Sequence, residues 1–415
     1  MNGTMNPNLM TSTERRASGT LASIFALRML GMFLVLPVFA IEAARYPGGE
    51  DASLVGLTMG LYGLTQAALQ LPFGLASDRL GRKRVIVAGL LIFAFGSFVA
   101  GAADSLQSLM IGRALQGAGA VSAAVTALLA DLTRDSVRTK SMALIGASIG
   151  LMFALSLVAA PLLNSLIGLP GLFSLTGVLA LTGIAVVIWA VPAEPAKHAD
   201  IPRGGLGLVL RDPALIRMNV GVFILHAVQM AMWLALPAML VEAGIAKEHH
   251  WWVYLPAVLG SFVVMGMTLF PMEKRGYLRA VFLVSIGTVA VVQLGLLGVA
   301  GSLVQSEPSV RLICLSVLLF LFFCGFNVLE ASQPSLVSKL SPSHAKGAAM
   351  GVYNTLMSFG LFAGGAIGGL VLKGYGVTGL FLTGTVLMVL WLLVAWPMRQ
   401  PIPVAPTASS EQVAA

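Results

Sequence analysis

Twelve apolar stretches, each long enough for one membrane crossing, follow one another along this sequence and are separated by polar segments. An α-helix needs about 20 residues to cross the hydrocarbon core of a bilayer. Only 10% of the residues are charged, whereas soluble domains carry about 25%. The sequence therefore predicts an all-α protein that crosses a membrane twelve times. The expected spans are 18–42, 52–76, 84–102, 105–131, 138–164, 170–191, 214–241, 250–271, 278–303, 309–336, 345–372 and 376–397.

The polar segment 192–213 is longer than the other loops, and it concentrates proline and charged residues. We interpret it as a linker between two pseudo-symmetric bundles of six helices. A weak repeat supports this division, because Asp78–Gly81 after the second span is echoed by Glu273–Gly276 after the eighth. Repeats of this kind place a substrate site between the halves, near the middle of the membrane. The expected organisation is a cytoplasmic tail over 1–17, a first bundle over 18–191, the linker over 192–213, a second bundle over 214–397 and a disordered cytoplasmic tail over 398–415.

Lysine and arginine are distributed unevenly between the two sides of the predicted spans. If the N-terminus lies inside, 19 of the 25 fall in cytoplasmic segments. Cytoplasmic loops of membrane proteins carry such an excess of positive charge, so both termini are predicted to face the cytoplasm. The run His249–Trp252 then lies at the outer end of the eighth span. There we expect an aromatic anchor at the membrane interface rather than a metal site.

Away from the ends of the predicted spans, the arginine, lysine, histidine and acidic side chains are Arg28, Arg113, His226 and Glu330. Burying such groups in hydrocarbon is costly, so each needs a partner or a water-filled cavity. The two arginines stay protonated at any accessible pH, whereas His226 and Glu330 can exchange a proton. If the protein moves protons, we rank Glu330 first and His226 second as the carrier, with the arginines tuning their neighbours. The sequence leaves open whether Arg28 and Glu330 form a structural pair between the halves or part of a site.

Amide and aromatic side chains gather on single faces of several spans at helical spacing. A cavity lined by such groups, with few charges, favours apolar or weakly polar substrates. The amides fit a structural role equally well, in which they hydrogen-bond between helices. The candidate cavity residues are Tyr62, Gln66, Gln70, Gln116, Gln229, Trp233, Asn327, Tyr353, Asn354 and Met357.

A dense polar segment, Gly74-Leu-Ala-Ser-Asp-Arg-Leu-Gly-Arg-Lys-Arg84, separates the second and third spans. It resembles the motif between the second and third helices of the major facilitator superfamily, a family of secondary transporters. The resemblance implies a gate in which Gly74 lets the second helix approach the eleventh closely and Asp78 lies near the start of that helix, at Lys346–Ala349. Arg82 would pair with Asp131. The implied gating residues are Gly74, Asp78, Arg79, Gly81, Arg82 and Asp131.

Further stretches strengthen this resemblance. Leu109–Gly119 resembles the motif of the fourth helix, whose arginine, here Arg113, is associated with proton coupling. Gly146–Pro161 resembles the antiporter signature of the fifth helix, although Ala160-Pro161 stands where that signature has Gly-Pro. Stretches at Leu27–Pro37, Leu132–Lys140 and Gly347–Tyr353 are similar to the bacterial YajR group, which implies a twelve-helix protein of the inner membrane. That group carries a soluble domain after the twelfth helix, and we expect no counterpart here because the sequence ends at Ala415.

These features predict a secondary transporter that exports small amphipathic molecules by proton-coupled alternating access. An importer or facilitator of a polar metabolite, and a non-transporting receptor on the same scaffold, are the alternatives. The sequence contains no Gly-Lys-Ser/Thr phosphate loop, no His-Glu-x-x-His metal motif and no serine nucleophile elbow. We therefore expect no ATP site, no metal or other cofactor and no enzyme activity. The expected partners are a small-molecule substrate, protons and the lipid bilayer, with no nucleic acid, and the expected state is a monomer.

Overall fold

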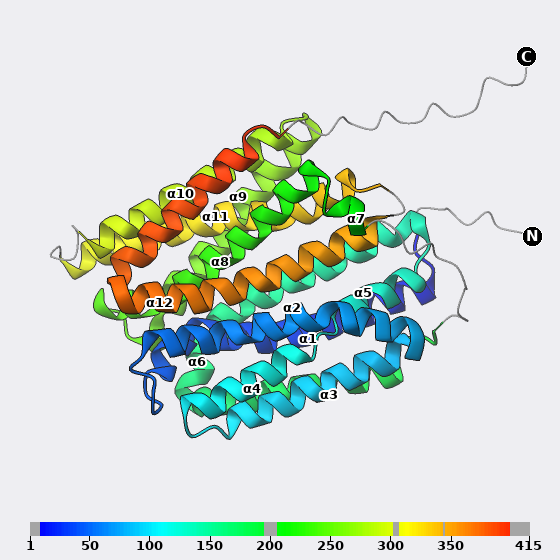
Figure 1. The fold of residues 1–415 in the computed structure, drawn as a ribbon, viewed down its shortest axis with the longest axis horizontal. Helices are drawn as coiled ribbons and strands as arrows, with labels where there is room; N and C mark the ends of the chain where they lie inside the picture. The colour runs from blue at the N-terminus through cyan, green and yellow to red at the C-terminus, as the bar shows by residue number, and fades with distance from the viewer. Residues whose placement is uncertain (1–8, 195–205, 302–306, 343–344, 399–415) are drawn as a thin grey trace, which may run out of the picture.

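The computed structural model describes residues 9–194, 206–301, 307–342 and 345–398. Within these ranges all regular structure is helical (Figure 1). The helices are α1 (Ser12–Ala43), α2 (Ala52–Leu80), α3 (Arg82–Gly101), α4 (Leu106–Ala118), α5 (Ser122–Asp131), α6 (Asp135–Ala185), η1 (Val186–Ala190), α7 (Leu206–Val209), α8 (Pro213–Glu242), η2 (Lys247–His249), α9 (Trp251–Lys274), α10 (Leu278–Ala300), α11 (Pro308–Leu340) and α12 (Lys346–Ala395).

Ten helical segments of the described residues are long and apolar enough to cross a membrane, with α4 and α5 taken together. Two of them, α6 and α12, have 51 and 50 residues, more than twice the length of one crossing. Each turns at a glycine with positive φ, Gly168 at 65° and Gly376 at 67°, a conformation that glycine adopts readily. Each of these helices therefore makes two crossings, which confirms the predicted twelve. The matching positions of the two turns also support the repeat between the halves.

The span expected over 105–131 is not one helix, which corrects the prediction. α4 ends at Ala118 and α5 begins at Ser122. At the break the chain passes close to α3, where a Cβ on Gly119 would lie 2.5 Å from the carbonyl oxygen of Gly89. Glycine permits this approach of two backbones, and the apolar pattern of the sequence does not reveal it. The break brings Ser122 within reach of α1.

The first helix begins at Ser12, ahead of the start expected at residue 18. Thr11 and Glu14 form a capping box, in which each side chain accepts a hydrogen bond from the backbone of the other residue. The Glu14 carboxylate also accepts a hydrogen bond from Arg134, with 2.8 Å between Oε1 and Nε. These contacts extend α1 beyond the apolar part of its sequence.

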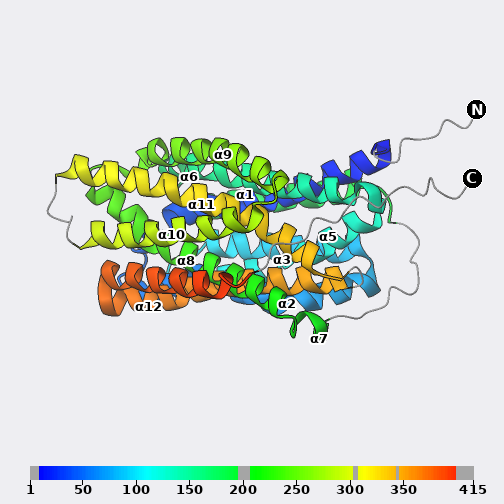
Figure 2. The same cartoon turned by 90° about the horizontal axis from the view of Figure 1, so that it is seen from above.

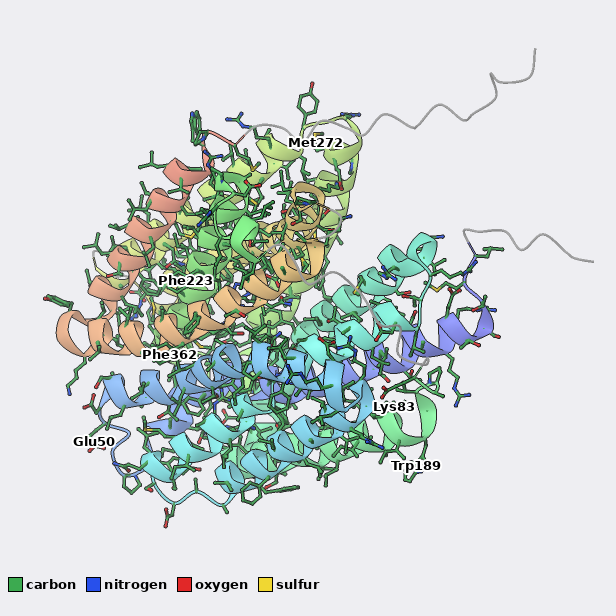
Figure 3. All side chains as sticks on the ribbon, turned by 45° about the vertical axis from the view of Figure 1, so that its right-hand side comes forward. Glu50, Lys83, Trp189, Phe223, Met272 and Phe362 are labelled. Carbon is green, nitrogen blue, oxygen red and sulfur yellow. The ribbon has the colours of Figure 1, made fainter. Side chains whose placement is uncertain are left out.

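The helices form two bundles, α1 to η1 and α8 to α12, which lie side by side in both views of the ribbon (Figures 1 and 2). They diverge toward the end at which α1 begins and α12 finishes (Figure 3). We call this the inner end, because the sequence predicts that it faces the cytoplasm, and the opposite one the outer end. The described residues of the 192–213 segment are 192–194 and 206–213, which contain the short helix α7 and the first residue of α8.

Contacts between the bundles gather at the outer end. A Cβ on Gly365 of α12 would lie 2.5 Å from the carbonyl oxygen of Gly56 and 2.7 Å from the amide nitrogen of Gly60, both on α2. Such small residues let two helix backbones touch. Toward the inner end, a Cβ on Gly146 or Gly351 would meet nothing within 4 Å. The bundles therefore touch at the outer end and lie apart at the inner end, where they diverge (Figure 3).

Candidate functional site

A buried polar cluster surrounds Arg28 in the middle of the first bundle. Its guanidinium donates to the Ser122 hydroxyl at 2.7 Å, to the Tyr62 hydroxyl at 2.8 Å and to Gln66 Oε1 at 3.3 Å. The charge also lies 5.8 Å from the centre of the Phe93 ring, close enough for a cation–π contact. Tyr62 and Gln66 thus act here as partners of an arginine on a neighbouring helix.

Arg113 lies beside this cluster and is held in a similar way. It donates to Gln116 Oε1 at 2.9 Å and to the Met59 carbonyl at 3.3 Å. Its guanidinium lies 5.0 Å from the centre of the Tyr62 ring. Gln116 in turn donates to the Ser97 hydroxyl at 2.9 Å. Both arginines are thus surrounded by neutral hydrogen-bond acceptors and aromatic rings of their own bundle.

The structure does not pair Arg28 with Glu330, although the sequence suggested a pair between the halves. Within the described ranges neither Arg28 nor Arg113 forms an ion pair with a carboxylate. The reason is helix rotation: α1 directs Arg28 toward α2 and α5, inside the first bundle. Glu330 belongs to the second bundle and has a different partner.

Glu330 and His226 approach one another, which brings together the two leading candidates for proton transfer. The distance between Glu330 Oε2 and His226 Nε2 is 3.5 Å. The other ring nitrogen, Nδ1, lies 2.9 Å from the Val222 carbonyl oxygen. Because a carbonyl only accepts, Nδ1 carries a proton. Nε2 therefore faces the Glu330 carboxyl group. A favourable contact between them requires one further proton, either on the carboxyl group, which then donates to Nε2, or on Nε2, which then donates to the carboxylate.

The two members of this pair differ in their access to water. The His226 side chain is 6% exposed, whereas that of Glu330 is 38% exposed. Glu330 Oε2 itself is buried and accepts no hydrogen bond in the described structure. A buried carboxyl oxygen without a hydrogen-bond partner is costly, so the contact with His226 is the one nearby interaction that can offset this cost. The half-exposed Glu330 gives the buried histidine a route to solvent.

Aromatic rings connect this pair to the other bundle. The ring of Phe326, on α11, lies 6.2 Å from that of His226 and 6.3 Å from that of Phe153 on α6. Phe153 packs edge-on against Phe33 of α1 at 4.9 Å. Sequence reasoning missed these phenylalanines, because an apolar ring facing the other bundle has no signal that separates it from one facing lipid. The Gly-x-x-x-Gly spacings at 56–60 and 365–369 were a usable signal for the outer contact.

The predicted cavity residues divide into a half-buried group and a buried group. Asn354 and Met357 on α12 are half-buried. Trp233 is fully buried against Tyr254, at 5.5 Å between ring centres, and Asn327 donates to the Ser261 hydroxyl at 2.8 Å. These last two therefore serve the packing of the second bundle in this conformation. The other buried candidates are Tyr62, Gln66, Gln70, Gln116, Gln229 and Tyr353.

The polar segment between α2 and α3 is held by Arg82. Its guanidinium lies 2.5 Å from Asp78 Oδ1 and 3.0 Å from Asp131 Oδ2, so the contact expected between Arg82 and Asp131 is present. Gly81 has a φ of 102°, which a side chain would strain. Gly74 was expected to pack on the eleventh span, which is the first half of α12. That packing is absent from this conformation, because a Cβ on Gly74 would meet Ala123 of α5 instead. The structure is open at the inner end, so the helices expected to meet there lie apart.

Two ion pairs join the bundles at the outer end, Glu42 with Lys247 and Asp51 with Lys373. Asp51 Oδ2 lies 2.6 Å from Lys373 Nζ, and this hydrogen bond lowers the pKa of Asp51 from 3.8 to about 2. A carboxylate with a lowered pKa stabilises the closed state above its ordinary pKa. That contribution is lost only as the pH falls from about 4 to about 2.

The Asp51–Lys373 pair is therefore expected to be insensitive to pH between 8 and 5. Spin labels at Glu50 and Ser309, at the outer ends of the two bundles, should report the same pH profile in the wild type and in Asp51→Asn. A widening of this distance on acidification that occurs in the wild type and is absent from the variant would contradict the assignment.

Comparison with known proteins places this geometry in context. Residues 21–304 match the family model of the Major Facilitator Superfamily. The chain is 42% identical to the inner membrane transport protein YajR of Escherichia coli, over 96% of this chain and 86% of that one. It is 29% identical to the multidrug resistance protein MdtH of Yersinia enterocolitica, over 82% of each. The solved structure of the nucleoside transporter NupG has the same fold, with a TM-score of 0.72 and 13% identity over 92% of this chain and 99% of that one.

Proposed function

Because the chain belongs to the major facilitator superfamily, we propose that it is a proton-coupled exporter of small amphipathic molecules. It works by alternating access as a monomer, and a proton gradient drives it without ATP or another cofactor. Both termini face the cytoplasm, so the open inner end admits substrate from that side. His226 and Glu330 carry the proton, while Arg28 and Arg113 maintain a positive potential in the first bundle.

The observation that carries this proposal is the contact between His226 and Glu330. The pair is the one place among the described residues where a histidine meets a carboxyl group in the middle of the spans. The hydrogen bond from Nδ1 to Val222 requires a second proton for a favourable contact with Glu330. Loss of that proton leaves a carboxylate facing a lone pair, which favours separation of α8 and α11. Protonation is thereby linked to helix position.

The direction and the substrate class are supported by separate observations. The chain resembles a protein named for multidrug resistance over 82% of its length. The half-buried cavity candidates on α12, Asn354 and Met357, offer one amide and one flexible apolar side chain. Such a surface suits amphipathic molecules better than highly polar ones. An importer would share the same fold, so the direction of flux is the property to measure.

Transport by the reconstituted full-length chain tests the proposal. Inside-out proteoliposomes with an acidic interior should accumulate members of a panel of fluorescent amphipathic compounds, and an ionophore that dissipates the pH gradient should stop this. Movement out of the vesicles under the same gradient would identify an importer. Absence of both gradient-driven flux and exchange, for a panel compound shown to bind the protein, would favour a receptor.

We further propose that the polar segment between α2 and α3 closes the inner end. In the closed state Asp78 lies at the start of α12, whose helix dipole favours a carboxylate by about 0.3–1 kcal/mol. Asp78→Asn should therefore shift the equilibrium about twofold to fivefold toward the inner-open state. Spin labels at Thr13 and Tyr277, on the inner ends of the two bundles, should report this shift.

Asp104→Asn supplies the control, since it makes the same chemical change on an exposed loop at the outer end. It should leave the inner distances unchanged. If Asp78→Asn gives the same distance distribution as Asp104→Asn, the polar segment has no closing role.

A further inference from the structure

A groove lies at the inner end, on the flank of the first bundle that faces away from the second. It has a volume of about 510 Å³, within the range of about 300–1,000 Å³ typical of small-molecule sites. Two of its lining side chains, Leu91 and Ile188, are more than half exposed. It therefore opens toward the bilayer rather than into the transport pathway. Its walls are Lys83, Arg84, Val87, Ala88 and Leu91 of α3 with Val187 and Ile188 of η1.

Positive charge concentrates at the mouth of this groove. Lys83 Nζ donates to the Val191 carbonyl at 2.6 Å, and Arg84 is exposed. Neither forms an ion pair within the part of the chain that the structure describes. Arg16 adds a third cation, because it donates to the Ala190 carbonyl at 2.9 Å. The carboxylate of Glu194 lies at the start of α3 and accepts from the backbone amide of Arg82 at 3.1 Å, so the cations outnumber it.

Trp189 marks the depth of the groove in the membrane. Its side chain follows Ile188 directly and is 77% exposed. Lys83 and Trp189 lie on the same flank at the inner end (Figure 3). Tryptophan is enriched where headgroups meet acyl chains. The cations of the mouth thus lie at headgroup level, and the apolar walls lie at the level of the first acyl carbons.

We propose that this groove binds an anionic phospholipid of the leaflet at the inner end. The phosphodiester lies between Lys83 and Arg84, and one acyl chain follows Val87, Ala88 and Leu91. Basic residues at a membrane surface attract anionic headgroups, and the apolar walls require an attached chain, which a soluble phosphate lacks. A zwitterionic lipid fills the same walls but gains less from the two cations. This site is separate from the proposed transport pathway.

Quenching of Trp189 by brominated lipids tests the proposal on the full-length chain in nanodiscs. The signal of Trp189 is taken as the difference between the wild type and Trp189→Phe. Brominated phosphatidylglycerol should displace phosphatidylcholine from this position with a preference of about fivefold for each cation, and the preference should fall at high salt. Equal quenching by the two brominated lipids would overturn the proposal.

Two variants address charge and shape separately. Arg84→Gln should reduce the preference for phosphatidylglycerol about fivefold, and this side chain makes no hydrogen bond within the described residues that its loss would break. Ala88→Phe fills the groove without changing charge and should reduce quenching by both lipids. If Ala88→Phe leaves quenching unchanged, the lipid contacts the charges without entering the groove, and the proposal fails.

The second bundle offers a matched control. Arg279 at the start of α10 donates to the carbonyls of Trp396 and Met398, at 2.7 and 2.5 Å. In the same way, Lys83 at the start of α3 donates to the carbonyl of Val191, at the end of the first bundle. Trp396 is 62% exposed. Arg279→Gln should leave the lipid preference at Trp189 unchanged. A loss equal to that of Arg84→Gln would show that only the overall charge of the inner face matters, and would overturn a specific site.

Discussion

Glu330→Gln is expected to abolish the accumulation of substrate that a pH gradient drives, while exchange of substrate across the membrane continues. Glutamine has nearly the same shape and can donate to His226 Nε2 through its amide. The contact between α8 and α11 therefore persists, but the group no longer gains and loses a proton. Coupling to a gradient requires that the number of bound protons change between states, whereas exchange does not.

His226→Gln is expected to have a smaller effect, because Glu330 remains titratable and is 38% exposed. Glu273→Gln is the matched control for the glutamate. Its side chain is 36% exposed and pairs with Lys339 at the inner end of α9. Uptake driven by the pH gradient and counterflow are measured in the same proteoliposomes. If Glu330→Gln still accumulates substrate against its gradient, Glu330 has only a structural role.

Gly365→Ala is expected to open the outer end of the protein. The added methyl group would lie 2.5 Å from the carbonyl oxygen of Gly56 and 2.8 Å from the Cα of Gly60, and these backbone atoms cannot rotate away. Overpacking of this kind costs about 1–3 kcal/mol, which corresponds to a shift of about 5- to 150-fold between two states. Alanine is also the better helix former, so loss of the closed state would reflect packing between bundles rather than a weaker helix.

Distances between spin labels at Glu50 and Ser309 measure this opening, in a background in which Cys314 and Cys324 are replaced by serine. The outer distance should lengthen in Gly365→Ala. Gly374→Ala is the control, since a methyl group at that position of α12 meets nothing within 4 Å. Unchanged outer distances in Gly365→Ala would show that the glycine contact does not hold the bundles together.

The sequence by itself determined the class of the fold, the number of membrane crossings and most of the candidate residues. These properties are local, because the cost of placing a segment in hydrocarbon depends on its own side chains. The same reasoning singled out Arg28, Arg113, His226 and Glu330, since a charge within an apolar run is conspicuous without knowledge of its neighbours. The polar segment from Gly74 to Arg84 likewise revealed its place at a membrane face.

The tertiary structure alone decided which of these residues meet. It paired Glu330 with His226 rather than with Arg28, broke the fourth span at Gly119 and placed Gly56 rather than Gly74 against α12. Each outcome depends on the rotation of a helix about its axis and on which end of the two bundles is closed. An apolar sequence specifies these only weakly, because lipid-facing and helix-facing surfaces are almost equally hydrophobic. Packing between helices, and not the hydrophobicity of any one of them, therefore sets the partners.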